Sequence, residues 1–337
     1  MHSHSIVPDW TRAGGEVALD GILRESSDDF AVTEVLGFDP DGTGEHDFLL
    51  IEKRDTNTAW LARKLAAFAD IPARDVGYSG LKDRHAVTLQ WFSVRRPGGT
   101  AANWQAFDAE GVRLLDVSRN SRKLRRGAHA GNSFRIVVRA LRGNTEQLDS
   151  DIAVIVRDGV PNYFGEQRFG HDGGNVELAK SLFGGKHLPR EKRSIALSAA
   201  RSWLFNHYLQ MRVQDQTWQQ LGIGQLAALD GSASVFEVID VDATLRDRSA
   251  ALDVHPTGPM WGSLDHGVRR EPLEIAIREQ FPDIADGLEK HTRASRRSLR
   301  LAVKDLKWSL FEDSLTLEFY LTRGSYATAV LRELVNY

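Results

Sequence analysis

The stretch GYSGLKDRHAVTLQWFSV, from Gly77 to Val94, carries the strongest structural signal of this 337-residue chain. Apolar and polar residues alternate after its charged centre at the spacing of a β-strand, and glycines interrupt a shorter strand-like run before it. The charged centre, KDRH at 82–85, is therefore predicted to form a short loop that a sheet holds at both ends.

Asp83 in this loop is the candidate catalytic residue. A carboxylate between two cations, here Lys82 and Arg84, stays ionised at neutral pH and can act as a nucleophile or an electrostatic stabiliser. The loop by itself also fits a second interpretation, an exposed hairpin whose charges are solvated.

A second segment, GVPNYFGEQRFG at 159–170, favours the functional interpretation. Its glycines, proline and aromatic residues are typical of an ordered functional loop rather than a linker. Together with GLKDRHA at 80–86, it makes the chain resemble the TruD family of tRNA pseudouridine synthases, whose catalytic aspartate lies in a GxKDxxA loop. Further motifs of the family follow in the family's order: DDFAVTEVLGF (28–38), DGTGEH (41–46), NTAWLARKLAAFA (57–69), GNSF (131–134), AARSWLFN (199–206), PTGPMWG (256–262) and GSYATAVLRELV (324–335).

The resemblance implies an α+β fold. It implies a pseudouridine synthase core with a mixed or antiparallel sheet and flanking helices, interrupted by an inserted α+β TRUD domain. The discontinuous catalytic core would comprise residues 1–157 and 303–337, and the inserted domain residues 158–302.

The resemblance also implies a reaction, the isomerisation of uridine to pseudouridine in tRNA at uridine 13, the family's target. The base leaves C1′ through N1 and is rejoined through C5, without redox change. We therefore expect no cofactor, and the sequence contains neither a phosphate loop nor metal-ligand spacing. The expected partner is tRNA.

By the same resemblance, four residues line a pocket for the uridine: Phe30, Asn132, Phe134 and Tyr326. Each has a plainer explanation, since Phe30 and Phe134 begin strands and could be core, and Asn132 follows a glycine as in a turn. Tyr326 replaces the Phe of other members, which adds a hydroxyl. Around Asp83, Lys82 and Arg84 are expected to act by charge, and Arg24 is a further candidate.

Lysine and arginine gather in three places: Arg119 to Arg126, Lys186 to Arg193, and Arg293 to Arg300. Because the net charge is only -3, RNA contact must come from such local clusters, although each could be a solvated face. The candidates for RNA contact are Arg122, Lys123, Arg125, Arg126 and Arg168.

In the inserted region, the run from Asn162 to Arg168 could face RNA or brace the domain internally, and Asn206 is expected to be structural. Among the regular elements, Asn57 is expected to cap a helix containing Leu61, Leu65 and Phe68. Ser325 is expected to cap the last helix.

The absence of cysteine excludes disulfides and thiolate metal sites and suits a reducing cytoplasm. The sequence has no apolar run of transmembrane length, so we expect a cytoplasmic protein without membrane contact. The expected oligomeric state is a monomer.

Two rival functions remain. One is an RNA-binding module without catalysis, which would not need an acid between Lys82 and Arg84. The other is a glycosidic hydrolase using Asp83 with His85, which normally needs a second carboxylate that the sequence does not offer.

Overall fold

The structure, a computed structural model, describes residues 6–96, 102–232 and 234–337. The chain forms two compact units, each built from separated segments. The sheet unit comprises Ala18–Glu146, Val303–Gly324 and Val335–Tyr337. The helical unit comprises the segment up to Val17, Gln147–Ala302 and Ser325–Leu334.

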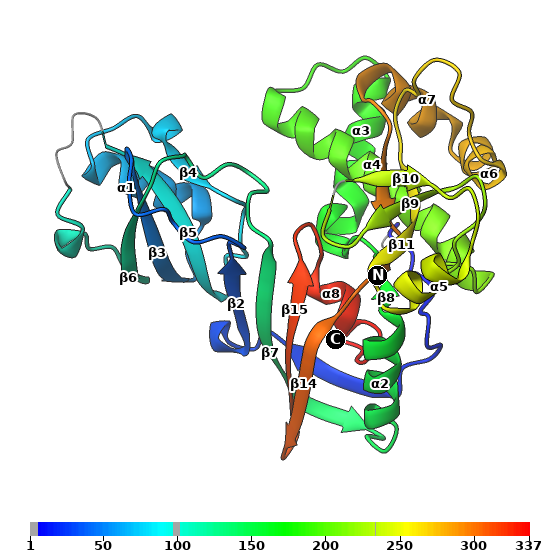
Figure 1. The fold of residues 1–337 in the computed structure, drawn as a ribbon, viewed down its shortest axis with the longest axis horizontal. Coiled ribbons are helices and arrows are strands. Elements are labelled where there is room, and N and C mark those ends of the chain that lie inside the picture. The colour runs from blue at the N-terminus through cyan, green and yellow to red at the C-terminus, as the bar shows by residue number, and fades with distance from the viewer. Residues whose placement is uncertain (1–5, 97–101, 233) are drawn as a thin grey trace. The chain divides into compact units, whose positions relative to one another are not determined.

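The sheet unit is built around a mixed β-sheet, coloured blue to green and orange to red in Figure 1. Its strands lie in the order β14-β15-β7-β2-β5-β3-β6, with β1 beside β7 and β4 beside β5. In chain order they are β1 (Leu19–Leu23), β2 (Phe30–Val35), β3 (His46–Arg54), β4 (Val76–Tyr78), β5 (Val87–Arg95), β6 (Val112–Asn120), β7 (Gly131–Gly143), β14 (Lys304–Phe311) and β15 (Ser314–Thr322).

The pairings of β2 bring distant segments together. Because β2 and β5 are parallel and Ala31 lies opposite Val87, the loop that precedes β5 reaches the sheet beside Phe30. On its other edge, β2 is antiparallel to β7, which places Glu34 opposite Asn132. The N-terminal ends of β2 and β5 therefore lie side by side at the same end of the sheet.

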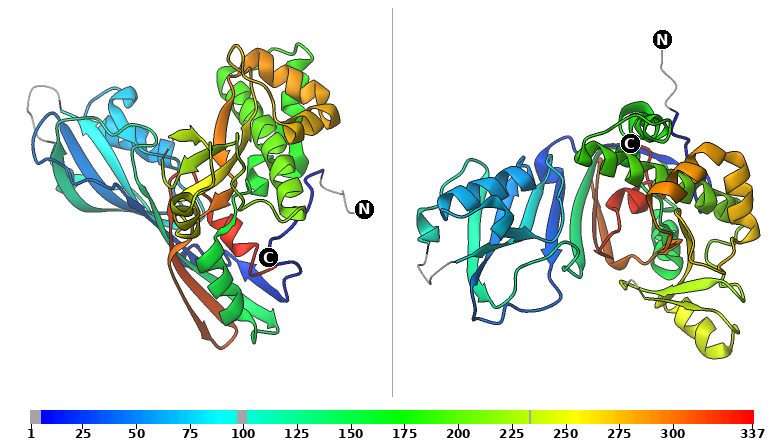
Figure 2. Two further views of the ribbon diagram at one scale, coloured as in Figure 1. Left: turned by 45° about the vertical axis from the view of Figure 1, so that its right-hand side comes forward. Right: turned by 90° about the horizontal axis from the view of Figure 1, so that it is seen from above.

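Helix α1 (Thr58–Phe68) covers one face of this sheet (Figure 2). As predicted, the Asn57 side chain caps it by accepting hydrogen bonds from two backbone N–H groups of the first turn, at 2.9 and 3.1 Å. Leu61 and Leu65 are fully buried, whereas Phe68 is exposed at the edge of the face. The polar cap and the apolar stripe together place α1 over β3 and β5.

The helical unit contains a sheet of order β10-β9-β11-β12 and a short pair, β8 with β13. Its strands are β8 (Val160–Pro161), β9 (Leu226–Leu229), β10 (Val235–Glu237), β11 (Val254–Met260), β12 (Ser295–Ser298) and β13 (Arg300–Leu301). Its helices are α2 (Leu148–Asp158), α3 (Gly174–Phe183), α4 (Arg190–Gln214), α5 (Ala243–Ala250), α6 (Pro272–Gln280), α7 (Pro282–His291) and α8 (Ala327–Leu331). Helix α4 supplies much of the core, including Trp203, Phe205 and Tyr208.

The expected α+β class and mixed sheet are confirmed. The domain boundaries remain a prediction, and the compact units group residues 147–157 and 325–334 with the region predicted as inserted. The N-cap of α8 is Tyr326, not Ser325, and its side chain does not cap the helix. Among the helices in the described ranges, none is long and apolar enough to cross a membrane.

The third basic cluster, Arg293 to Arg300, is not an exposed patch as a whole. Arg296 forms ion pairs with Glu271, at 2.8 Å, and with Glu274. Arg300 is 5% exposed, and its guanidinium donates to the backbone oxygen of Val254 at 2.9 Å. These two charges therefore bind structural partners within the helical unit.

Candidate active site

Asp83 lies in the loop between β4 and β5, as the sequence predicted. The side chain of Gln90 donates to the backbone oxygen of Gly80 at 2.7 Å, near the start of the loop. The backbone N–H of Lys82 donates to Thr58 Oγ1 at 3.2 Å. The Asp83 side chain is 39% exposed. The carboxylate thus has a fixed backbone and remains accessible to a substrate.

Arg24 supplies the cation that pairs with Asp83. Its Nη2 lies 2.9 Å from Oδ2 of Asp83, and its guanidinium carbon lies 4.1 Å from the ring centroid of Phe30. The backbone of Arg24 is left-handed, with φ of 60°, which costs a non-glycine residue about 1–2 kcal/mol. Strain of this kind collects at functional sites, where it aims a side chain.

Phe30 and Phe134 are both packed in the interior, with 2% and 9% of their surface exposed. Their ring centroids lie 6.3 Å apart, edge to face, and Phe134 also stacks on Phe319 at 5.4 Å. Arg24 covers one face of Phe30. A uracil could stack on that face only after Arg24 leaves it, so the assignment of these rings to the substrate stays a prediction.

The ammonium of Lys82 is directed to Glu34 and Asn132 rather than to Asp83. Its Nζ lies 2.9 Å from Oε2 of Glu34 and donates to Oδ1 of Asn132 at 2.5 Å. The Glu34 side chain is fully buried, and burial raises its pKa although Lys82 opposes the shift. Because an ammonium can only donate, it fixes Oδ1 toward Lys82 and leaves the amide N–H groups of Asn132 to donate elsewhere.

Lys53 holds the Asp83 loop through its backbone. The Lys53 side chain, fully buried at the end of β3, donates to the backbone oxygens of Thr56 at 2.8 Å and Asp83 at 3.2 Å. Burial lowers the pKa of Lys53 to about 8. Its hydrogen bonds fix the position from which the Asp83 side chain projects.

Neither Glu34 nor Lys53 was predicted from the sequence to be part of the site. Both are charged residues on the buried face of a strand, Glu34 in β2 and Lys53 in β3. Each occupies a strand position whose neighbours on the same face are mostly apolar, and this pattern could have identified both residues. A charged side chain is buried on a strand face only where a partner compensates its loss of hydration.

The other charges of the tetrad face solvent. Arg84 is exposed. The imidazole of His85 is 79% exposed, and its Nδ1 lies 3.8 Å from a carboxylate oxygen of Asp55. The hydrolase interpretation requires His85 to work with Asp83, and this geometry directs it to Asp55 instead.

Tyr326 and Arg168 lie in the helical unit and contact each other. Arg168 donates to the Tyr326 hydroxyl and, at 3.0 Å, to Oγ of Ser198. The Tyr326 ring centroid lies 5.8 Å from that of Phe164. The hydroxyl that distinguishes this residue from Phe therefore has a structural partner. The roles of Tyr326 at the uridine and of Arg168 in RNA contact stay predictions.

Much of the NYFGEQRFG segment braces the helical unit. Asn162, Tyr163 and Phe164 are at most 5% exposed, whereas Gln167 is exposed. The amide of Asn206 in α4 accepts from the backbone N–H of Phe164 at 3.0 Å and donates to its oxygen at 2.9 Å. For the three buried residues, the internal interpretation fits and the RNA-facing one does not.

The remaining candidates for RNA contact lie together in the sheet unit: Arg122, Lys123, Arg125 and Arg126. Lys123 donates to the backbone oxygen of Arg74. Arg122 and Arg125 are exposed, and within the described residues neither forms an ion pair. These two are therefore available to bind phosphate.

In residues 6–96, 102–232 and 234–337, no group of three or more His, Asp or Glu side chains is arranged to bind a metal ion.

A solved structure from Methanosarcina mazei, assigned to tRNA pseudouridine synthase D, has the same fold. The TM-score is 0.72 over 96% of this chain and 95% of that chain, at 19% sequence identity. The fold is therefore that of the TruD class of pseudouridine synthases.

Sequence comparison extends this result. The family model for tRNA pseudouridine synthase D (TruD) matches residues 15–183 and 180–334. The tRNA pseudouridine synthase D of Methylococcus capsulatus is 45% identical over 335 residues, covering 98% of this chain and 95% of its own. That of Nitrosococcus oceani is 44% identical over 332 residues, covering 96% and 93%. The chain belongs to the tRNA pseudouridine synthase D family, which confirms the resemblance seen in the sequence.

Proposed function

We propose that the protein isomerises uridine 13 of tRNA to pseudouridine, with Asp83 as the catalytic group. The observation that carries the proposal is the Asp83 carboxylate, 39% exposed, paired with Arg24 at 2.9 Å and held through its backbone by Lys53. Family membership supports the reaction and tRNA as the substrate. Since tRNA is the substrate, we place the protein in the cytoplasm.

The reaction needs an ionised, accessible carboxylate. The N1–C1′ bond breaks, a C5–C1′ bond forms, and the proton lost from C5 is balanced by one gained at N1. Asp83 can attack C1′, attack C6, or remove the C2′ proton to give a glycal, and each route uses the same group. The partly exposed Asp83 side chain is accessible to a substrate on all three routes.

Asn132 would contribute to recognition of the base. Lys82 holds the oxygen of its amide, so the amide N–H groups are the part that can donate to a uracil carbonyl. Extruding the uridine from its helix costs a few kcal/mol, and stacking on Phe30, once Arg24 has moved, would offset part of that cost.

The proposal is tested with Asp83→Asn, which removes the charge and keeps the volume. We expect turnover of unmodified tRNA, measured by chemical mapping of pseudouridine, to be abolished while tRNA binding persists. The matched control is Asp253→Asn, which removes an aspartate paired with Arg248 in the helical unit and should leave turnover unchanged.

Three outcomes would contradict the proposal. Near wild-type turnover in Asp83→Asn would remove Asp83 from the chemistry. Free uracil released in place of pseudouridine would indicate a hydrolase. Tight binding without any modification of tRNA by the wild-type protein would indicate a binding module.

A further inference from the structure

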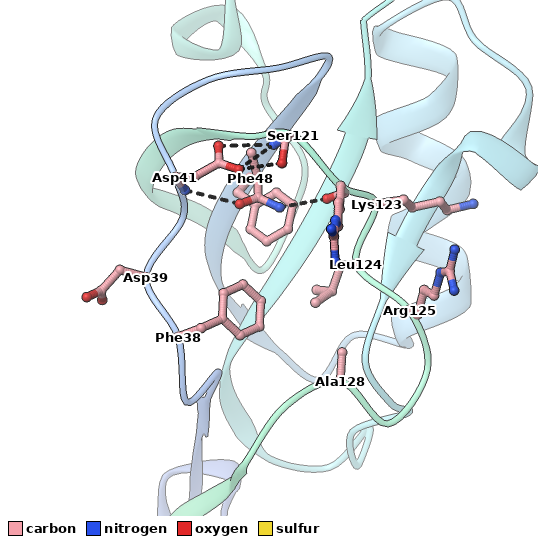
Figure 3. A pocket seen from close by; sticks show the side chains of 11 residues that line it. Phe38, Asp39, Asp41, Phe48, Ser121, Lys123, Leu124, Arg125 and Ala128 are labelled. Carbon is pink, nitrogen blue, oxygen red and sulfur yellow. Dashed lines mark hydrogen bonds between the residues drawn. The ribbon is translucent and has the colours of Figure 1, made fainter.

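A surface pocket of about 760 Å³ opens beyond the end of β2 in the sheet unit, outside the proposed active site (Figure 3). Its walls are apolar: Phe48 and Leu124 are at most 2% exposed, and Ala128 packs against them. Phe38 is 43% exposed, and its ring faces Leu124 across the hollow. A volume in the range of about 300–1,000 Å³ is that of small-ligand sites in general.

The pocket is rimmed by cations without acidic partners. Arg122 and Arg125 line it and, in the part of the chain that the structure describes, form no ion pair. Two carboxylates also line the pocket. Asp39 points away from the hollow in Figure 3.

The second carboxylate, Asp41, is held by hydrogen bonds from its own loop and from Ser121, which follows β6. It accepts hydrogen bonds from the backbone N–H groups of Thr43, at 3.0 Å, and Ser121, at 3.0 Å, and from the Ser121 hydroxyl at 2.5 Å. These bonds lower the pKa of Asp41 to about 2, the Ser121 hydroxyl contributing most. Within the described residues, Asp41 is therefore held by these donors and pairs with neither arginine, so Arg122 and Arg125 stay open to an incoming anion.

We propose that this pocket binds an unpaired nucleotide of the RNA substrate, with its base stacked on Phe38 and its phosphates at Arg122 and Arg125. This inference rests on the proposed function, because it takes tRNA as the RNA. The combination of an exposed aromatic ring with unpaired basic side chains is the one that single-stranded nucleic acids use for sequence-tolerant binding.

The bound nucleotide would be different from the target uridine. Phe30, beside Asp83, begins β2, whereas Phe38 follows the other end of that strand. Between the first and last residues of β2 there are five Cα-to-Cα steps, which at about 3.3 Å per step separate the two places by roughly 17 Å. The pocket would therefore anchor a second part of the RNA rather than take part in the isomerisation.

The test measures equilibrium binding of labelled, unmodified tRNA to full-length protein. Phe38→Ala should weaken binding by about 5- to 140-fold, the loss of one base-aromatic stack. Phe38→Leu, which retains apolar volume, should weaken it as well, whereas Phe38→Trp should not. The control is Phe311→Ala, because Phe311 is 75% exposed in the same unit and lies outside the pocket. Melting temperatures identify any variant that fails to fold.

The salt dependence of tRNA affinity distinguishes the phosphate contacts at Arg122 and Arg125 from the base stacking on Phe38. Replacing Arg122 and Arg125 by alanine should reduce the slope of log affinity against log salt by about two, whereas Phe38→Leu should leave the slope unchanged. Wild-type affinity in Phe38→Leu, or equal losses in Phe38→Ala and Phe311→Ala, would overturn the inference. If the wild-type protein forms no pseudouridine, the proposed function fails, and the Phe38 variants still decide whether the pocket binds RNA.

Discussion

Arg24 holds Asp83 and Phe30 with one guanidinium, and it does so from a left-handed backbone. The ion pair is only partly buried and contributes at most about 1 kcal/mol, and the contact with the ring adds about 0.5–1 kcal/mol. Glycine at this position would recover about 1–2 kcal/mol of backbone strain. The contributions nearly cancel, so stability alone gives Arg24 no advantage over glycine.

We therefore expect Arg24→Gly to leave the melting temperature within a few degrees of wild type while turnover falls at least tenfold. Glu312→Gly is the matched control, because Glu312 has a similar φ of 51° and lies in the hairpin between β14 and β15. It should leave turnover unchanged. Full turnover in Arg24→Gly would mean that Asp83 needs no cation from this residue.

At this scale, the sequence identified Asp83 and offered Arg24 only as a further candidate beside it. The motif around Asp83 is a run of consecutive residues, so it can be recognised in the sequence without knowledge of the fold. Arg24 lies 59 residues away, and the charge argument favoured the adjacent Lys82 and Arg84. Lys82 instead pairs with buried Glu34, since a buried carboxylate attracts the nearest ammonium more strongly than an exposed one.

Among the elements, strands in which apolar and polar residues alternate could be predicted from the sequence. Which strands pair with each other could not. The alternation in β5, β7 and β15 identifies each as a strand, because one face of each is buried. The parallel pairing of β2 with β5 depends on the register of distant segments, which no local pattern encodes. Yet this pairing brings Phe30 next to the Asp83 loop.

The brace between α4 and the segment after β8 gives a prediction at this scale. Asn206→Ala leaves both the N–H and the oxygen of Phe164 buried without partners, so we expect the free energy of unfolding to fall by about 2–4 kcal/mol. Urea denaturation measures the loss. Gln214→Ala, on an exposed position of the same helix, should change stability by less than about 0.5 kcal/mol. Equal effects of the two substitutions would show that the amide braces nothing.

In the molecule as a whole, each unit contains a histidine with a lowered pKa, buried His129 in one and partly buried His207 in the other. Burial lowers the pKa of His129 in the sheet unit to about 4, with Lys82 and Arg323 contributing. Burial also lowers the pKa of His207 in the helical unit to about 4, where its ring packs against Phe281 at 4.4 Å. In the unfolded chain both titrate near the ordinary value, about 6.5.

Between pH 6.5 and 4 the unfolded chain therefore binds protons that the folded chain does not, so stability falls as the pH falls. We expect the urea midpoint to drop across this window. In the double variant His129→Gln, His207→Gln, the drop should be smaller, because neither replacement takes up a proton. The midpoint is measured by circular dichroism at each pH, and parallel curves for the two proteins would contradict the assignment.

The place of β15 in the sheet affects how the chain is made. Strand β7 pairs with β2 on one edge and with β15 on the other, and β15 follows the whole segment 147–302 in the chain. A ribosome therefore releases β7 long before it makes the neighbour of its second edge. Until residues 314–322 have been translated, the nascent chain carries an open strand edge, the kind of surface that recruits other unfinished chains. A ribosome that stalls late in the message thus leaves a chain that is nearly full length and still has that edge exposed.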